Sequence, residues 1–196
     1  MNQQLIAAAG AGDTARVEAL LGQGAAIDAR DERGRTAVMA ATHGNHVAVV
    51  TALVRAGADV DIRDDRLDNP FLYAGAEGLL EILRVVAPHA NTRIVNRYGG
   101  IAIIPAAERG HVEVMRFLLE HTGSNVNHVN NLGWTALLEA IILADGGPRH
   151  QQIVELLLDH GADPTIADHD GITPLAHARR MGFGEIEQLL IAAGAR

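Results

Sequence analysis

Short apolar segments recur along this chain at a nearly constant interval, and a polar phrase precedes each of them. The clearest copies lie at residues 31–41 and 168–178, where Asp, Gly and Thr come before a run of small and branched apolar residues. The positions equivalent to Thr36 are Asn69, Ile101, Thr135 and Thr173, at intervals of 33, 32, 34 and 38 residues, with Gln3 in a degenerate first copy. This period predicts a repeat protein, in which each unit buries its apolar face by stacking on its neighbours.

The polar residues of each phrase predict where turns close and helices begin. Thr36, Asn69, Thr135 and Thr173 are residue types that cap a helix N-terminus, and Pro70 and Pro174 occupy the first helical position, which needs no amide hydrogen. An Asp or Asn also stands five residues before each cap position, Ile101 included, and its side chain can close an Asx-turn. These residues are Asp31, Asp64, Asn96, Asn130 and Asp168. Gly57 and Gly161 follow the second helices and predict left-handed helix ends.

Together these motifs resemble the ankyrin repeat. The resemblance rests on the in-phase phrases Asp168-His-Asp-Gly-Ile-Thr-Pro-Leu175, Gly110-His111, and Gly57-Ala-Asp59, with apolar segments such as 154–158, and it covers nearly the whole chain. It implies that each unit is a helix, a short antiparallel helix and a β-hairpin-like finger. We therefore expect an all-α ankyrin-repeat solenoid.

The phase of the repeats sets the expected domain organisation. One domain should span residues 1–196 and hold about six repeats, with a degenerate first repeat and a capping last repeat made polar by Glu185, Glu187 and Gln188. The approximate repeat boundaries are 1–30, 31–63, 64–95, 96–129, 130–167 and 168–196.

Composition narrows the class of partner. The net charge is −8, from 24 acidic and 16 basic residues, which disfavours nucleic acid because phosphate binding needs a basic surface. There is no cysteine, so disulfides and thiolate metal sites are excluded. Residues 5–12 are apolar but lack a basic start and are too short for an export or membrane segment. We expect a cytoplasmic monomer without a cofactor, a metal ion or a membrane contact.

Departures from the repeat pattern indicate where the surface is irregular. Leu67 replaces a finger glycine, and Pro88 interrupts a second helix. Ile101 cannot cap a helix and Pro105 follows it, so we expect the fourth inner helix to begin about one turn late, near Ile104 or Pro105. The late start predicts a pocket flanked by Tyr73 and Glu139. About five extra residues around 144–151 predict an inserted loop.

Two sets of residues are candidates for contact with a partner. The finger set combines aromatic, apolar and arginine side chains, the composition of binding hot spots: Arg97, Tyr98, Asn131, Leu132, Trp134 and Ile172. An alternative role for Trp134 is packing over the next finger. The inner-helix set is Tyr73, Glu139 and His177.

Glu139 and His177 could face each other from neighbouring repeats. A carboxylate and an imidazole suggest acid–base or metal chemistry, but no third group, nucleophile or phosphate loop accompanies them, so we expect no enzyme. The other histidines, His43 and His150 among them, lack a ligand spacing and are expected in loops and turns.

The sequence therefore predicts a protein-interaction module that presents rigid fingers and inner helices to a protein partner. One alternative is a secreted effector that uses the same surface on a eukaryotic target. Another is binding of a small ligand or metal ion at Glu139 and His177.

Overall fold

A computed structural model describes residues 1–196, which form twelve α-helices, one short 3-10 helix and no β-strand. The chain divides into two compact units, unit 1 (Met1–Arg97) and unit 2 (Tyr98–Arg196). The helices of unit 1 are α1 (Asn2–Gly10), α2 (Thr14–Gly22), α3 (Ala37–His43), α4 (Val47–Arg55), α5 (Pro70–Glu77), α6 (Leu80–Val86) and the 3-10 helix η1 (Ala87–His89). Those of unit 2 are α7 (Ile103–Glu108), α8 (Val112–His121), α9 (Ala136–Ile142), α10 (Pro148–Asp159), α11 (Pro174–Met181) and α12 (Gly184–Ala192).

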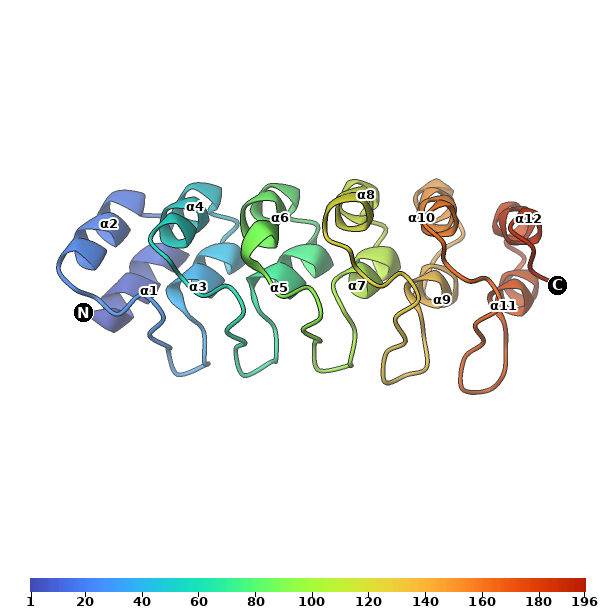
Figure 1. Cartoon of the computed structure of the whole chain (residues 1–196), viewed down its shortest axis with the longest axis horizontal. Coiled ribbons are helices and arrows are strands. Elements are labelled where there is room, and N and C mark those ends of the chain that lie inside the picture. Colours follow the sequence, from blue (N-terminus) through green and yellow to red (C-terminus); the bar gives the residue numbers. More distant parts are fainter. The chain divides into compact units, whose positions relative to one another are not determined.

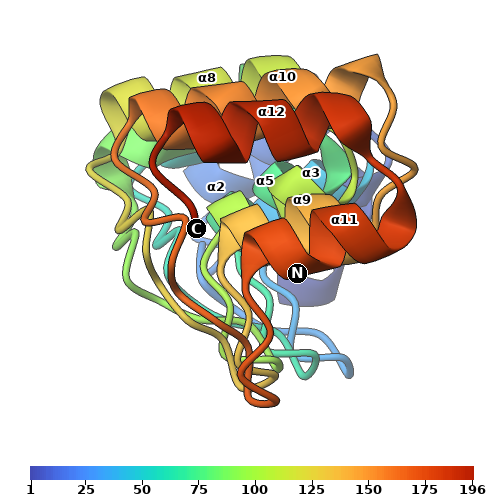
Figure 2. The ribbon, with the colours of Figure 1, turned by 90° about the vertical axis from the view of Figure 1, so that its right-hand side faces the viewer.

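Each unit has two rows of helices. In unit 1 the inner helices α1, α3 and α5 form one row, the outer helices α2, α4 and α6 form the other, and the loops project from the side of the inner row (Figure 1). Viewed along its stack, unit 2 repeats this arrangement, with α8, α10 and α12 above α9 and α11 and the loops below (Figure 2). The all-helical repeat solenoid predicted from the sequence is confirmed.

Apolar side chains that face between the rows form the core. Each α-helix supplies two or more buried residues, for example Val49 and Leu53 of α4 and Ile153 and Leu157 of α10. Their spacing of four residues places each pair on one face of its helix, so the two rows bury a continuous apolar strip within each unit.

The predicted helix caps are present. Thr36 and Thr135 accept hydrogen bonds from the backbone N–H groups of Met39 and Leu138, at 3.3 and 3.2 Å. Asn69 and Thr173 cap α5 and α11 in the same way, and proline occupies the first helical position of both helices. Gly57 and Gly161 have φ values of 93° and 85°, so the predicted left-handed helix ends are also confirmed.

We call the five residues before each cap a finger: 31–35, 64–68, 96–100, 130–134 and 168–172. In four fingers, the Oδ1 atom of the first residue accepts hydrogen bonds from the backbone N–H groups two and four residues later. The backbone N–H of that residue also donates to the carbonyl oxygen of the last finger residue. These are the expected Asx-turns of Asp31, Asp64, Asn130 and Asp168.

Leu67 occupies the finger position at which Gly34, Gly133 and Gly171 have φ values of 71–79°. It adopts the same left-handed conformation, with φ of 63°. A side chain is strained in this region, and the leucine is also exposed. The finger geometry is therefore retained in spite of an unsuitable residue.

The predicted delay of helix α7 is too large. The helix begins at Ile103, one residue after the position expected from the other repeats and not one turn later. The backbone N–H of Ile104 donates to Ile101 O at 3.0 Å, so a tight turn replaces the missing cap. Pro105 fits because the first helical turn needs no amide hydrogen at that position.

Two other irregularities also lie in helices. Helix α6 ends at Val86, and Pro88 lies in the 3-10 helix η1 that follows. The predicted interruption of the second helix at Pro88 is therefore confirmed. The expected inserted loop is only partly a loop, because Pro148 to Gln151 form the first turn of a lengthened α10. Proline is well suited to that first turn, which explains why the insertion extends the helix.

Candidate functional site

The finger tips of unit 2 carry exposed apolar side chains. Tyr98 is 50% exposed and Leu132 is 48% exposed, as expected from their finger positions. The backbone N–H of Asn131 donates to Tyr98 O at 2.9 Å and joins the two fingers. His128 adds a second link, because its Nε2 donates to Gly99 O at 2.7 Å. The backbone that carries the exposed apolar side chains is therefore held in place by hydrogen bonds between neighbouring fingers.

Trp134 and Ile172 are less exposed than Tyr98 and Leu132. Both side chains are only partly exposed, so neither is as accessible as the two finger tips. Each is the last residue of its finger, next to the cap of an inner helix, and its backbone is held by the Asx-turn.

Arg97 belongs to unit 1. Its Nη1 lies 3.8 Å from Asp68 Oδ2, and about half of its side chain is exposed. Burial and the neighbouring Asp64 raise the pKa of Asp68, and the charge of Arg97 opposes that rise. Arg97 thus helps to keep a partly buried carboxylate ionised.

Glu139 is buried under its own finger. Its side chain is 5% exposed, and its Oε1 accepts a hydrogen bond from Asn130 Nδ2 at 2.8 Å. Burial and the negative charge of Glu108 raise the pKa of Glu139 to about 7, against the opposing effect of the Asn130 hydrogen bond. Near neutral pH this carboxyl group is therefore only partly ionised.

His177 occupies the equivalent place in the next repeat. Its Nε2 donates to Asp168 Oδ2 at 2.7 Å, and both side chains are largely buried. Hydrogen bonds from the backbone N–H of Ile172 and from His177 lower the pKa of Asp168. Glu139 and His177 both lie nine residues after the first residue of a finger, and each is bonded to its own finger. Helical spacing allowed Glu139 and His177 to face each other, but each forms its hydrogen bond beneath its own Asx-turn.

The inner-helix residue Tyr73 packs against a histidine in unit 1. The ring centroids of Tyr73 and His43 are 4.0 Å apart, and the rings are inclined by 41°. His43 is the last residue of α3, so the expectation of a loop or turn position was wrong for it. His150 likewise lies within α10. The pocket predicted between Tyr73 and Glu139 stays a prediction, since these residues belong to different units.

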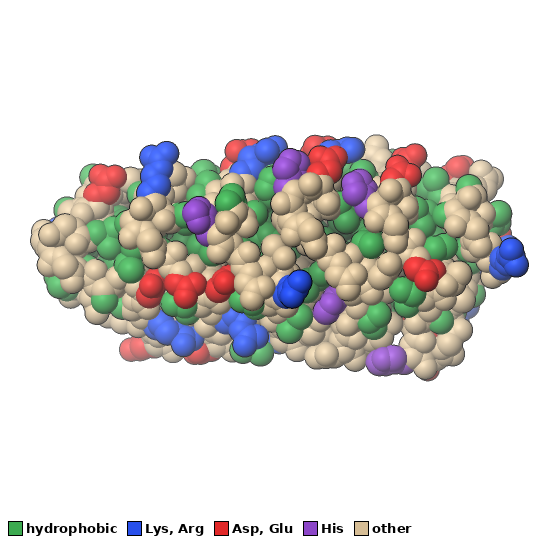
Figure 3. All heavy atoms as spheres, in the orientation of Figure 1, with side chains coloured by type: hydrophobic (Ala, Val, Ile, Leu, Met, Phe, Trp, Pro, Cys, Tyr) green, Lys and Arg blue, Asp and Glu red, His purple; other side chains and the backbone are tan.

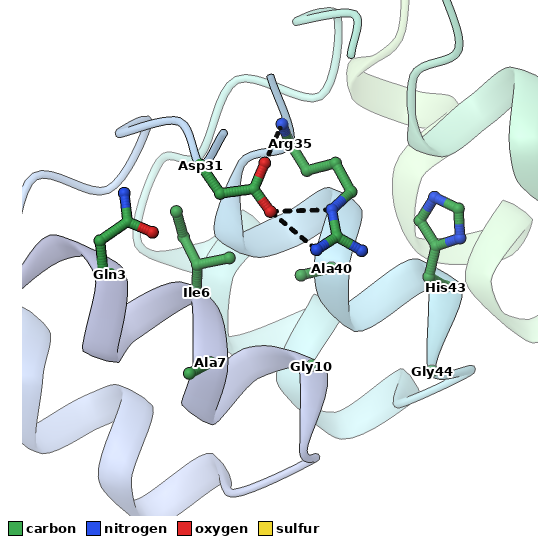
Figure 4. Close-up of a pocket in the computed structure, with 9 residues that line it drawn as sticks. All are labelled: Gln3, Ile6, Ala7, Gly10, Asp31, Arg35, Ala40, His43 and Gly44. Atoms are coloured by element: carbon green, nitrogen blue, oxygen red, sulfur yellow. Dashed lines mark hydrogen bonds and ion pairs between the residues drawn. The ribbon is translucent and has the colours of Figure 1, made fainter. Parts of the chain in front are cut away.

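Sequence reasoning missed a pocket in unit 1. Residues of α1, α3 and the first finger line it, and its volume is about 470 Å³ (Figure 4). The lining residues are Gln3, Ile6, Ala7, Gly10, Asp31, Arg35, Ala40, His43 and Gly44. The available signal was Ala40, a small residue at the position that holds Tyr73, Glu139 and His177 in other repeats.

Neither unit contains a group of three or more His, Cys, Asp or Glu side chains placed to hold a metal ion. No helix has the length and apolar character needed to cross a bilayer.

Comparison with known proteins identifies the family. The family Ankyrin repeats (3 copies) matches residues 5–94 and 71–168. The ankyrin repeat protein YahD of Escherichia coli (strain K12) is 46% identical over 189 residues, which cover 96% of this chain and 94% of YahD.

Two solved structures are similar over nearly the whole chain. An ankyrin repeat domain from Acinetobacter baumannii AYE has 56% identity and a TM-score of 0.95, and covers 98% of both chains. The ankyrin repeat protein EF0377 has 38% identity and a TM-score of 0.94, and covers 100% of this chain and 99% of its own. Ankyrin repeats are protein–protein interaction modules, and the chain belongs to the ankyrin repeat family.

Proposed function

We propose that this chain binds a protein partner through its fingers and inner helices and has no enzymatic activity. The observation that carries the proposal is the pair of exposed apolar tips in unit 2, Tyr98 and Leu132, with exposed Val129 beside them. Large apolar and aromatic side chains at an accessible position are typical anchors of protein interfaces.

The bracing of these tips favours binding. Asn131 and His128 fix the finger backbone through hydrogen bonds to Tyr98 O and Gly99 O. A surface that is already ordered loses less conformational entropy on association than a flexible one. Four other predicted residues of unit 2 would surround this centre or support it from beneath: Trp134, Ile172, Glu139 and His177. Arg97 and Tyr73 of unit 1 are also proposed to contact the partner.

The polar groups of the inner helices have structural partners, which favours a binding role over catalysis. Glu139 is hydrogen-bonded to Asn130, and His177 to Asp168. A general acid or base needs access to a substrate, whereas both side chains are buried beneath their fingers. We propose a cytoplasmic monomer that uses neither nucleic acid nor membrane as its partner.

The test is affinity capture from the native organism, followed by measurement of the dissociation constant with the purified partner. Replacing both Tyr98 and Leu132 with alanine should weaken binding by at least about thirtyfold, because even one central anchor contributes about 2 kcal/mol or more.

The matched control replaces Leu143 and Ile191 with alanine. These residues are equally exposed, at 48% and 47%, but lie outside the fingers. Their replacement should leave affinity within about threefold of wild type. Equal affinities for the two double variants would contradict the proposal.

A further inference from the structure

The pocket of unit 1 exists because Ala40 is too short to hold its finger. In unit 2 the residue nine positions after the Asx bonds to it, as Glu139 does to Asn130. The methyl group of Ala40 cannot reach Asp31 in this way, and Arg35 holds Asp31 instead. The pocket lies beside Ala40 and Arg35, and residues of α1 line its other side (Figure 4).

Asp31 is fully engaged by its own finger. Its Oδ1 accepts hydrogen bonds from the backbone N–H groups of Arg33 and Arg35, both at 2.9 Å. Its Oδ2 lies 2.9 Å from Arg35 Nε and 2.7 Å from Arg35 Nη2. Although burial alone would raise the pKa of Asp31, these hydrogen bonds lower it, so the carboxylate is ionised. It offers a ligand no unused acceptor position of comparable strength.

Arg35 keeps unused donors. Only Nε and Nη2 contact Asp31, which leaves both N–H groups of Nη1 and one of Nη2 without a partner. These groups lie at the end of the guanidinium that points away from Asp31, on the side of His43 (Figure 4). The side chain is 27% exposed, so a ligand can reach this end. Two adjacent guanidinium N–H groups match the two oxygens of a carboxylate.

The rest of the lining favours a ligand with an apolar stem. Ile6, Ala7 and Ala40 form an apolar wall. Burial, followed by the nearby charge of Arg35, lowers the pKa of His43, so its ring is neutral. The Nε2 atom of this ring is buried and has no hydrogen-bond partner. The volume lies within the range of about 300–1,000 Å³ typical of ligand sites.

We propose that this pocket binds an acidic side chain, Asp or Glu, of a protein partner, with the unused N–H groups of Arg35 as donors to its carboxylate. The pocket offers fixed donors above an apolar wall, and the Asp31 carboxylate is already neutralised by Arg35. The methylene groups of the ligand would pack against Ile6 and Ala40. This proposal rests on the proposed function, since it assumes that the partner is a protein.

The test uses the full chain and two capped peptides, acetyl-Ala-Ala-Glu-Ala-Ala-amide and the same peptide with Gln in place of Glu. Titration is followed by NMR at the Arg35 Nε–H group and the backbone amides of Gly10 and Gly44. The Glu peptide should bind about tenfold more tightly than the Gln peptide, because a charged acceptor forms the stronger hydrogen bonds. Equal affinity for both peptides would overturn the proposal.

Two variants locate the binding. Ala40→Leu fills the pocket and keeps the Asp31–Arg35 pair, so it should abolish the response to the Glu peptide. Its matched control is Ala48→Leu, at an exposed position of α4, which should bind as wild type does. If Ala40→Leu does not fold, Arg35→Lys serves instead, because it keeps a charge beside Asp31 but lacks the second pair of donors. Its affinity for the Glu peptide should fall to that of wild type for the Gln peptide. Unchanged affinity in either folded variant would refute the site.

Acetate distinguishes a protein ligand from a free carboxylic acid. It should bind more weakly than the Glu peptide, and binding at least as tight would overturn the assignment to a protein partner. The Tyr98 and Leu132 double variant should bind the Glu peptide as wild type does. Failure of the pocket proposal is therefore distinguishable from failure of the proposed function.

Discussion

The fingers of the two units share one backbone design but differ in the side chains that brace it. In unit 1, Arg30 donates to Gly34 O and Arg63 O, and Arg63 donates to Val95 O. The position equivalent to Arg30 and Arg63 is Val129 in unit 2, where His128 donates to Gly99 O. A backbone hydrogen bond between neighbouring fingers is common to both units, from Asp65 N–H to Arg33 O and from Asn131 N–H to Tyr98 O. The finger side of unit 1 is accordingly rich in arginine and acidic side chains, whereas that of unit 2 shows histidine and apolar groups (Figure 3).

Net charge follows a different division. Unit 1 has 10 arginines and 12 acidic residues, and unit 2 has 6 and 12, so the net charges are −2 and −6. Unit 2 is therefore the more acidic although its finger tips are the more apolar. The same Asx-turn is therefore compatible with arginine links between fingers in unit 1 and with a histidine link in unit 2. The two units consequently present different side chains on their finger sides.

The largest expected effect concerns the match between a finger and its inner helix. Asn130 donates to the carboxyl group of Glu139, whereas Asp168 accepts from His177. Asn130→Asp keeps the turn but places two carboxyl groups together in a buried site, which should cost about 2–4 kcal/mol of unfolding free energy at pH 8. The double variant with Glu139→His copies the pair of the next repeat and should restore most of this loss. Denaturant unfolding measures the unfolding free energy of both variants. A double variant no more stable than the single one would contradict the idea that each finger is matched to its own inner-helix residue.

A smaller effect concerns the protonation of Glu139. Its pKa of about 7 in the folded chain lies above the ordinary value of 4.5, so the unfolded chain loses this proton at lower pH than the folded chain. The stabilising contribution is fully present below pH 4.5 and is lost as pH rises through 7. Relative to Glu139→Gln, wild type should therefore lose about 2–3 kcal/mol of stability between pH 4.5 and 8.

Glu113→Gln is the matched control for this measurement, because Glu113 is exposed on α8. Its stability should follow that of wild type throughout the same pH range. If the Glu139→Gln variant also runs parallel to wild type, the buried carboxyl group does not titrate as described.

The smallest effect concerns the strained finger of unit 1. Leu67→Gly removes a side chain from a left-handed backbone and should stabilise the fold by about 1 kcal/mol. Leu132→Gly in unit 2 is the control, since Leu132 is equally exposed but does not have a positive φ. Thermal unfolding should show a higher midpoint for the first variant and no increase for the second. A lower midpoint for Leu67→Gly would show that the leucine stabilises its finger.

Features set by neighbouring residues could be predicted from the sequence. The caps of Thr36 and Asn69 and the turn of Asp31 depend on hydrogen bonds that span at most four residues, so residue types in phase are sufficient to identify them. The start of α7 could not be predicted to the residue, because the tight turn from Ile101 to Ile104 depends on local backbone geometry and not on a capping side chain.

The candidate site was predicted less completely. Finger spacing identified Tyr98 and Leu132 as surface residues, but it did not distinguish them from Trp134, which is only partly exposed. The partner of Glu139 depends on which way the side chain turns within its repeat, and helical spacing does not determine that. The pocket of unit 1 forms because the methyl side chain of Ala40 does not reach its finger. This difference is recognised only when equivalent positions of the repeats are compared in space.

We propose that the apolar fingers of unit 2 contact a protein partner. Hydrogen–deuterium exchange of the chain alone and in complex with its captured partner tests this proposal. We expect slower exchange on binding at residues 98–99 and 129–133, with a larger change there than at Arg33 or Arg66, the finger tips of unit 1. Slower exchange confined to the outer helices α8, α10 and α12, with none at residues 98–99 and 129–133, would contradict it.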